Sequence, residues 1–257
     1  MATVEANGVA HHYEEHGSGP VVMLLYGGLE SSASWDLQVP ALAEAHRVVL
    51  VDRRGHGRTA DVAGPITYAL MRDDTIACIE ALDLAGAHLV GWSDGGIIAL
   101  LVAIARPDLV GRIVTLGSNA SDDAYTPAAR TVLGRGSPML DLIRPDYDAV
   151  SPDGPDHWPV VLEKVQTMWW DDPLDFRAEL GGIDHPTMVM SGDDDCIDLG
   201  HSVDMFQRLP NGRLAVVPGA SHTAPVEQAA LVNDMILAFL DGPEPPAELM
   251  PLLPSRT

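Results

Sequence analysis

The chain has 257 residues, 46% of them hydrophobic, so we expect one domain with an insert rather than two independent halves. Its 37 acidic and 15 basic side chains give a formal net charge of -22, which argues against binding to nucleic acid or to anionic membranes. Two cysteines make no disulfide framework and the N-terminus reads as no signal peptide, so we expect a cytoplasmic protein. The longest apolar run, Ile97–Ala105, is too short to cross a bilayer.

Short apolar runs alternate with amphipathic stretches along the chain, a pattern typical of a mostly parallel sheet covered by helices. We predict an antiparallel edge strand followed by six buried strands, at Val9–Glu14, Val21–Leu25, Arg47–Val51, His88–Trp92, Arg112–Leu116, Thr187–Met190 and Leu214–Val217. Helices are predicted at Trp35–Ala45, Tyr68–Leu84, Gly95–Ala105, Leu199–Leu209 and Val226–Leu240. The predicted fold class is therefore α/β, with a doubly wound sheet.

One stretch interrupts this alternation. Residues 119–182 contain no buried strand, but short helical pieces with large apolar side chains, at Ala128–Leu133, Pro138–Ile143 and Pro159–Trp170. We interpret them as a helical lid packed over the sheet. The predicted organisation is a core of residues 1–118 and 183–241, a lid of residues 119–182, and a Pro-rich C-terminal tail of residues 242–257.

The strongest local motif lies at residues 91–96, which read Gly-Trp-Ser-Asp-Gly-Gly between a predicted strand and a predicted helix. This is a G-x-S-x-G pattern in strand–turn–helix context. The turn is so sharp that a Cβ two residues before or after the serine would collide with backbone. Ser93 is thereby held at a helix N-terminus, where negative charge is stabilised. The pattern predicts that Ser93 is a nucleophile.

A serine nucleophile needs a base, and the base needs an orienting partner. Residues 191–195, Ser-Gly-Asp-Asp-Asp, follow one predicted strand, and residues 218–222, Pro-Gly-Ala-Ser-His, follow the next. Both groups lie just past the carboxyl end of a parallel strand, the edge at which open α/β sheets form their sites. The chain order serine, aspartate, histidine is that of α/β-hydrolases.

From Ala6 to Leu240 the chain resembles the α/β-hydrolase superfamily, in its small lidded branch of serine esterases and lactonases. Residues 52–57, Asp-Arg-Arg-Gly-His-Gly, are similar to the family's D-x-R-G-x-G turn. The resemblance implies the α/β-hydrolase fold, with Ser93 as nucleophile and His222 as base. It implies Asp195 as the acid, ahead of Asp193 and Asp194, because the family's acid usually comes fourth in a G-D-x-D sequence.

The same resemblance implies an oxyanion hole made of two backbone N–H groups. One belongs to Asp94, and the other to Gly28, with its neighbour Leu29 as the alternative. The family loop usually begins with histidine, whereas this chain has Tyr26. One hypothesis is that the Tyr26 hydroxyl binds substrate, and the alternative is that Tyr26 only packs the loop. A phenol does not reproduce the two ring nitrogens of an imidazole.

Further side chains are candidates for substrate contact. Trp92 flanks the nucleophile, and the lid carries a methionine-rich and aromatic set, of which Met139, Tyr147, Trp158 and Trp169 are the predicted contacts. No metal site is predicted, because no His, Cys or Asp residues share a recognisable ligand spacing. We interpret Cys196, beside the predicted acid, as a small filler rather than a reactive thiol.

These roles predict an enzyme that cleaves a carboxylic ester or lactone of a small apolar substrate, with no cofactor. C–C bond hydrolysis, thioester cleavage and perhydrolysis use the same triad and stay as alternatives. The C–C hydrolases typically carry an H-G-x-G-P-G-like loop, which residues 26–29 do not match. A non-catalytic binder of a small ligand is the alternative outside catalysis. Oligomeric state stays open.

Overall fold

An eight-stranded sheet forms the centre of the structure, a computed structural model that describes residues 2–243. Its strands are β1 (Ala2–Ala6), β2 (Val9–Gly17), β3 (Val21–Leu25), β4 (Arg47–Val51), β5 (Ala87–Trp92), β6 (Val110–Leu116), β7 (Thr187–Gly192) and β8 (Gly212–Val217). They lie in the order β1-β2-β4-β3-β5-β6-β7-β8. The β1–β2 and β2–β4 pairs are antiparallel and all other pairs are parallel, so the carboxyl ends of six strands meet at one edge.

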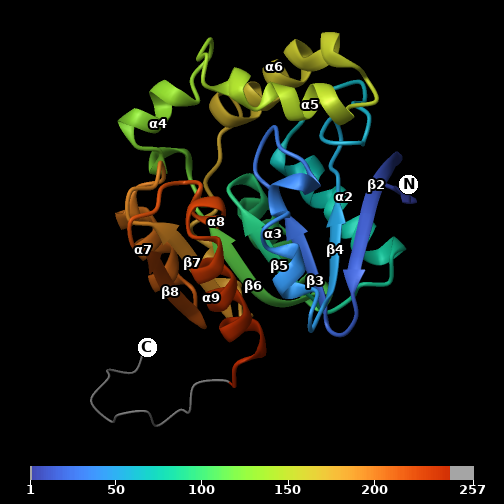
Figure 1. Ribbon diagram of the computed structural model, residues 1–257. Coiled ribbons are helices and arrows are strands. Elements are labelled where there is room, and N and C mark those ends of the chain that lie inside the picture. Colours follow the sequence, from blue (N-terminus) through green and yellow to red (C-terminus); the bar gives the residue numbers. More distant parts are fainter. Residues whose placement is uncertain (1, 244–257) are drawn as a thin grey trace.

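Helices cover both faces of this sheet (Figure 1). One face packs against α2 (Tyr68–Ala81), α3 (Asp94–Ala105) and α7 (Leu199–Arg208), and the other against α1 (Val39–Leu42), α8 (Ala224–Glu227) and α9 (Ala229–Asp241). The insert holds α4 (Pro127–Val132), α5 (Arg144–Val150) and α6 (Trp158–Trp170). Short 3-10 turns lie at Ser32–Trp35, Pro107–Leu109, Asp122–Ala124, Leu140–Leu142, Pro155–His157 and Glu179–Gly182.

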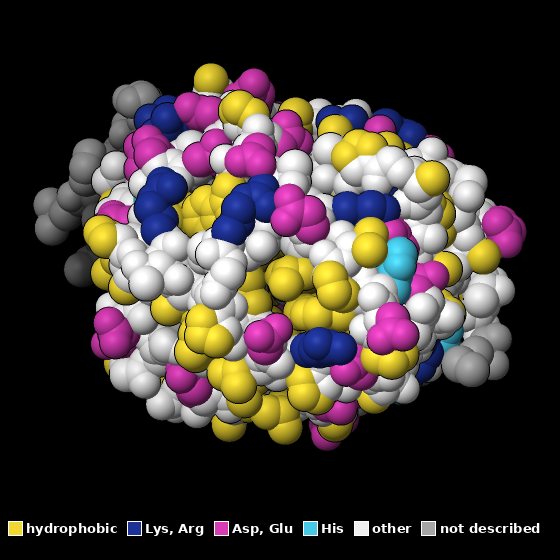
Figure 2. Space-filling view, turned by 90° about the horizontal axis from the view of Figure 1, so that it is seen from above, with side chains coloured by type: hydrophobic (Ala, Val, Ile, Leu, Met, Phe, Trp, Pro, Cys, Tyr) yellow, Lys and Arg dark blue, Asp and Glu magenta, His cyan; other side chains and the backbone are white. Residues whose placement is uncertain are grey.

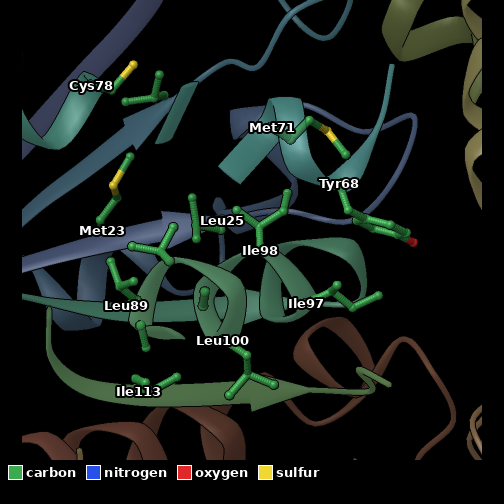
Figure 3. Close-up of a cluster of buried hydrophobic side chains, with 14 of the residues drawn as sticks. Met23, Leu25, Tyr68, Met71, Cys78, Leu89, Ile97, Ile98, Leu100 and Ile113 are labelled. Carbon is green, nitrogen blue, oxygen red and sulfur yellow. The ribbon is translucent and has the colours of Figure 1, made fainter. Parts of the chain in front are cut away.

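Alternate side chains of each buried strand enter two separate cores, because successive residues of a strand point to opposite faces. Met23 and Leu25 of β3 join the core under α2 and α3, and Leu25 lies near Ile98 of α3 (Figure 3). Val22 and Leu24 of the same strand join the core under α9. Each fully buried Val, Leu or Met side chain contributes roughly 1.5–3 kcal/mol, which explains why these strands read as unbroken apolar runs.

The helical insert, residues 119–182, lies above the carboxyl ends of the strands (Figure 1). Its buried apolar side chains, among them Tyr147, Trp158 and Met168, belong to the same core as α2 and α3. Figure 2 looks down on the outer face of this end, where hydrophobic side chains gather between acidic and basic ones. The insert is thus packed onto the sheet domain through a continuous apolar contact.

Three expected elements differ from the structure. The edge strand is β1, which pairs outside β2, because Val4 and Ala6 turn one face of a short polar strand toward the core. The helix expected at Trp35–Ala45 is replaced by a 3-10 turn and the short α1. The helix expected at Val226–Leu240 is divided into α8 and α9 at Gln228, whose φ of -127° and ψ of 40° are not helical.

Three further findings concern the C-terminal tail, the helix lengths and the insert. The expected Pro-rich tail falls almost wholly on residues 244–257, outside the residues that the structure describes. Within residues 2–243, no helix combines the length and the hydropathy needed to span a membrane. The short α5, which sequence patterning did not predict, begins at Arg144 with proline in its first turn.

Candidate active site

A strained turn between β5 and α3 presents Ser93 at the edge of the sheet. The φ of Ser93 is 53° and its ψ is -122°, a conformation that L-residues rarely adopt. A Cβ on Gly91 would collide with the backbone of Gly95, and a Cβ on Gly95 would collide with the carbonyl of Leu25. The need for glycine on both sides of Ser93, predicted from the motif, is therefore confirmed by the backbone geometry.

Ser93 lies at one end of a hydrogen-bonded row of three side chains. Its Oγ is 3.1 Å from Nε2 of His222, and Nδ1 of the same ring is 2.8 Å from Oδ1 of Asp195. Ser93 follows β5, Asp195 follows β7 and His222 follows β8, so parallel strand ends bring together residues that are distant in sequence. With the proton on Nδ1, Nε2 is free to accept the proton of the Ser93 hydroxyl.

The surroundings of His222 stabilise its imidazolium form next to an ionised Asp195. Burial opposes ionisation of Asp195, but the hydrogen bond and charge of His222 outweigh burial and lower its pKa. Burial also opposes the imidazolium form of His222, whereas hydrogen bonds with Asp195 and Cys196 raise its pKa well above the usual value. The arrangement can therefore stabilise the positive ring that forms when His222 takes a proton from Ser93.

Of the three consecutive acids, the structure places Asp195 at the histidine. Its Oδ1 also accepts the N–H of Ile197 at 3.0 Å, which fixes the carboxylate. Asp193 instead accepts the N–H of Ala220 at 3.2 Å, and Asp194 is exposed. The geometry therefore favours Asp195 as the acid.

The predicted oxyanion donors lie beside Ser93. Gly28 and Asp94 both line the cavity next to Ser93. Asp94 is the first residue of α3, so its N–H has no partner four residues back within the helix. A Cβ on Gly28 would collide with the indole of Trp169, so the loop approaches the insert more closely than any side chain would allow. Leu29, the alternative donor, has a φ of 64° and is buried.

Tyr26, which replaces the usual histidine, points away from this cavity. Its hydroxyl accepts the backbone N–H of Arg53 at 2.7 Å, and the residue is fully buried. The guanidinium of Arg53 lies over the tyrosine ring, 4.3 Å from its centroid, and donates to the carbonyl of Gly27 at 2.6 Å. Tyr26 and Arg53 together hold the loop of Gly27 and Gly28 in place. The structure therefore favours the interpretation that Tyr26 packs the loop over the one in which it binds substrate.

The side chain of Asp94 was not among the predicted features, yet it links three helices. Its buried carboxylate accepts the hydroxyl of Tyr68 in α2 at 2.8 Å and the indole N–H of Trp169 in α6 at 2.9 Å. Burial raises its pKa above the usual value, although the two donors and Arg53 oppose that shift. Asp94 therefore joins the nucleophile turn to the helical insert.

Glu30 places a second acidic side chain in the wall of the site. Its Oε2 accepts the N–H of Gly27 at 3.0 Å, and the residue lines the cavity together with Ser93 and His222. Burial raises the pKa of Glu30 to about 7 despite this hydrogen bond. The available sequence signal was an acidic residue directly after the glycine loop, which no motif distinguishes from a solvated acid.

Two cavities meet at the imidazole of His222. The nucleophile cavity, of about 80 Å³, contains Ser93, and the outer cavity, of about 630 Å³, contains Asp195. His222 and Leu133 line both. The nucleophile cavity is further lined by Gly27, Gly28, Glu30, Trp92, Asp94, Tyr125, Leu140, Ile143 and Trp169. The outer cavity is further lined by Thr126, Ala128, Ala129, Val132, Asp194, Cys196, Ser221 and Thr223.

The predicted substrate contacts divide into two groups. Trp92 and Trp169 line the nucleophile cavity, and Trp92 also donates its indole N–H to the carbonyl of His222 at 2.8 Å. Five others line neither cavity. Tyr147 and Trp158 pack on each other with ring centroids 5.3 Å apart, Met139 is 48% exposed, and Tyr26 and Leu29 are buried in the loop. Besides Trp169, the insert residues that line the nucleophile cavity are Tyr125, Leu133, Leu140 and Ile143, which were not among the predicted contacts.

The motif at residues 52–57 has a structural part in the site. Asp52 accepts the N–H of Ser32 at 3.0 Å and the N–H of Arg58 at 2.8 Å, so it joins two loops at the strand ends. Arg54 forms a bidentate pair with Asp74, with both N–O distances 2.6 Å. Both side chains of this pair are buried. The motif thereby anchors the loop from which the Arg53 side chain donates to the carbonyl of Gly27.

Comparison with known proteins identifies the family of the chain. The family model described as alpha/beta hydrolase fold matches residues 20–143. A non-heme haloperoxidase of Rhodococcus erythropolis is 30% identical, over 92% of this chain and 98% of its own. RutD of Agrobacterium fabrum, named as a candidate carbamate hydrolase, is 27% identical over 89% and 97%. The enol-lactonase of Burkholderia xenovorans LB400 is 25% identical, with a TM-score of 0.73 over 93% and 100% of the two chains. The chain therefore belongs to the α/β-hydrolase fold family.

Proposed function

We propose that the protein is a serine hydrolase that cleaves a carboxylic ester or a lactone through an acyl-enzyme. The observation that carries this proposal is the row Ser93–His222–Asp195, with contacts of 3.1 and 2.8 Å at the ends of three parallel strands, β5, β7 and β8. A purely structural role would not require a strained serine aimed at a histidine. The relatives named for carbamate and enol-lactone hydrolysis act on bonds with a carbonyl carbon, as the proposal does.

In the proposed mechanism, His222 takes the proton of Ser93 while Oγ attacks the carbonyl carbon. The N–H groups of Gly28 and Asp94 stabilise the tetrahedral oxyanion. Asp195 orients the ring and stabilises the imidazolium, which then protonates the leaving oxygen. Water, deprotonated by the same ring, attacks the acyl-enzyme and releases the acid. For a lactone, the leaving alcohol stays attached to the product.

The two cavities suggest how a substrate lies across the site. A volume of about 80 Å³ is far below the roughly 300–1,000 Å³ of pockets that enclose whole ligands, so the nucleophile cavity suits a short acyl group. The outer cavity, with about 630 Å³, lies within that range. Its α4 wall presents Ala128, Ala129, Val132 and Leu133, which favours an apolar body on the substrate.

A fluorophosphonate probe and a series of p-nitrophenyl esters test the proposal. Wild-type protein is expected to be labelled and to hydrolyse short acyl esters fastest, and Ser93→Ala to lose both properties. Ser202→Ala, which removes a buried hydroxyl on α7 that has no hydrogen-bond partner within the described residues, is the matched control. Labelling without turnover on any ester, lactone or carbamate would identify a ligand binder, and folded protein without labelling would refute the triad.

Perhydrolysis is a second candidate, favoured by the 30% identity to a protein named as a non-heme haloperoxidase. In this reaction hydrogen peroxide replaces water in the attack on the acyl-enzyme, and a peracid leaves. Bromide oxidation in the presence of acetate and peroxide measures it. Activity that disappears in Ser93→Ala would support this candidate, and its absence in an active esterase would exclude it.

A further inference from the structure

Three metal-ligating side chains meet where the two cavities adjoin. A carboxylate oxygen of Asp195, Sγ of Cys196 and a ring nitrogen of His222 all lie within 4.8 Å of one another. Across residues 2–243, no other group of three His, Cys or acidic side chains is so arranged. Ligand atoms around tetrahedral zinc are separated by roughly 3.5 Å, given metal–ligand distances of about 2.0–2.3 Å. Small side-chain rotations therefore suffice to close the group around an ion.

We propose that Asp195, Cys196 and His222 form an inhibitory site for a soft divalent cation such as Zn²⁺ or Cd²⁺. A thiolate and an imidazole select these ions over Ca²⁺ and Mg²⁺, which prefer oxygen ligands. The thiolate and the carboxylate together balance the double charge of the ion, and the thiol proton passes to solvent. The net charge of -22 raises the concentration of cations at the surface of the protein.

The outer cavity gives an ion access to this site. Asp195, Cys196 and His222 line it together, whereas Ser93 lines the nucleophile cavity. The His222 side chain is 25% exposed, and Cys196 is partly exposed. Three protein ligands leave a fourth position, which water from the outer cavity can fill. The exposed Asp194 adds negative charge beside the entrance.

Metal binding removes the base whichever ring nitrogen is used. An ion on Nδ1 displaces the hydrogen bond to Asp195 and leaves the ring proton on Nε2, which then cannot accept the proton of Ser93. An ion on Nε2 blocks the contact with Ser93 directly. Inhibition in this form rests on the proposed hydrolase function, whereas metal binding itself does not.

The proposal differs from two expectations from the sequence, that Cys196 is a filler and that no metal site is present. Asp195 and Cys196 are consecutive, and His222 lies on the next strand's loop, so no ligand spacing is visible along the chain. Pairing of β7 with β8 brings the two loops together.

Binding is tested first in Ser93→Ala, which retains all three ligands and does not depend on turnover. We titrate it with Cd²⁺ and follow the thiolate-to-cadmium charge-transfer absorption, with calorimetry for stoichiometry. One ion per chain and a clear band are expected. Adding Cys196→Ala should abolish the band and weaken binding at least ~10-fold. Cys78→Ala, which removes the other cysteine from a buried position on α2, should leave both unchanged.

Inhibition by Zn²⁺ is then measured in the wild-type protein, which retains Ser93, and is reversed with a chelator. The half-inhibitory concentration should rise at least ~10-fold in Cys196→Ala, with each variant compared with its own metal-free rate. A missing band, or equal metal affinity with and without Cys196, overturns the site. If the band appears in Ser93→Ala but the wild-type protein hydrolyses no substrate, the metal site is supported and the proposed function is refuted.

Discussion

The indole N–H of Trp169 in α6 donates to Oδ2 of Asp94, the residue that directly follows Ser93, over 2.9 Å. This bond joins the helical insert to the turn that holds Ser93. It is buried, and Tyr68 supplies the only other side-chain donor to the Asp94 carboxylate among the described residues. The insert therefore contributes to the position of the α3 N-terminus as well as to the wall of the cavity.

Trp169→Phe keeps most of the apolar contact and removes this donor. We expect a loss of about 1–3 kcal/mol in the free energy of unfolding, because a buried carboxylate loses a partner. The value of kcat/KM for a short p-nitrophenyl ester should fall about tenfold, which corresponds to ~1.4 kcal/mol. Urea unfolding and steady-state kinetics measure the two effects.

The neighbouring tryptophan supplies the control for this prediction. Trp170 is only partly buried and donates to the carbonyl of Leu133 at 3.3 Å, within the insert itself. Trp170→Phe should therefore leave kcat/KM close to the wild-type value. Equal losses in both variants would mean that the contact between Trp169 and Asp94 has no particular importance.

The three consecutive acids can be separated by substitution. Asp195→Asn should lower kcat by about 10⁴-fold, because an amide no longer enforces the tautomer that accepts the proton of Ser93. Asp194→Asn, at an exposed position, should have almost no effect. Asp193→Asn keeps an oxygen that can accept from Ala220 and should cost little. A large loss in Asp193→Asn alone would move the acid to that position.

Much of the sheet and the turn that holds Ser93 could be predicted from the sequence for a local physical reason, whereas the choice of Asp195 and His222 followed from the family resemblance. Buried parallel strands such as β3 need unbroken apolar residues, and the nucleophile turn needs glycine at positions 91 and 95. These requirements act over a few residues, so they are visible in a short window of sequence.

The cavity walls could not be predicted in the same way. Whether Trp169 or Trp158 faces the nucleophile depends on how α6 packs against the sheet domain, and both residues are apolar and buried. The roles of Glu30 and of the Asp94 side chain were overlooked because an acidic residue in a loop or at a helix N-terminus is usually solvated. Their surroundings follow from tertiary packing: Glu30 accepts from Gly27 in the wall of the cavity, and Asp94 accepts from Tyr68 and Trp169.

Glu30 makes the stability of the protein depend on pH. Its pKa is 4.5 in an unfolded chain and about 7 in the folded protein. Between these values the folded state keeps a proton that the unfolded state has released, so stability falls as pH rises. The contribution of the neutral carboxyl is complete below pH 4.5 and is lost as pH rises through 7. It amounts to about 3 kcal/mol, since each pKa unit corresponds to about 1.4 kcal/mol.

Glu30→Gln stays neutral and should remove this part of the pH dependence. We expect the variant to be the more stable protein at pH 8 and to lose that advantage at pH 5, as measured by urea unfolding. Glu44→Gln, at an exposed position, should follow the wild type at both values. Parallel pH profiles for wild type and Glu30→Gln would show that Glu30 is ionised and solvated in the folded protein.

The buried pair of Arg54 and Asp74 gives the last prediction. Their side chains are 8% and 2% exposed, so removing one partner leaves an uncompensated charge in the interior. Arg54→Met should lower the free energy of unfolding by about 3–5 kcal/mol, whereas the double variant with Asp74→Leu should recover most of that loss. Arg208→Met breaks the exposed pair with Asp204 and should cost at most about 1 kcal/mol. If the double variant is no more stable than Arg54→Met, the pair acts through its geometry, by holding the loop of Arg53, rather than through its buried charge.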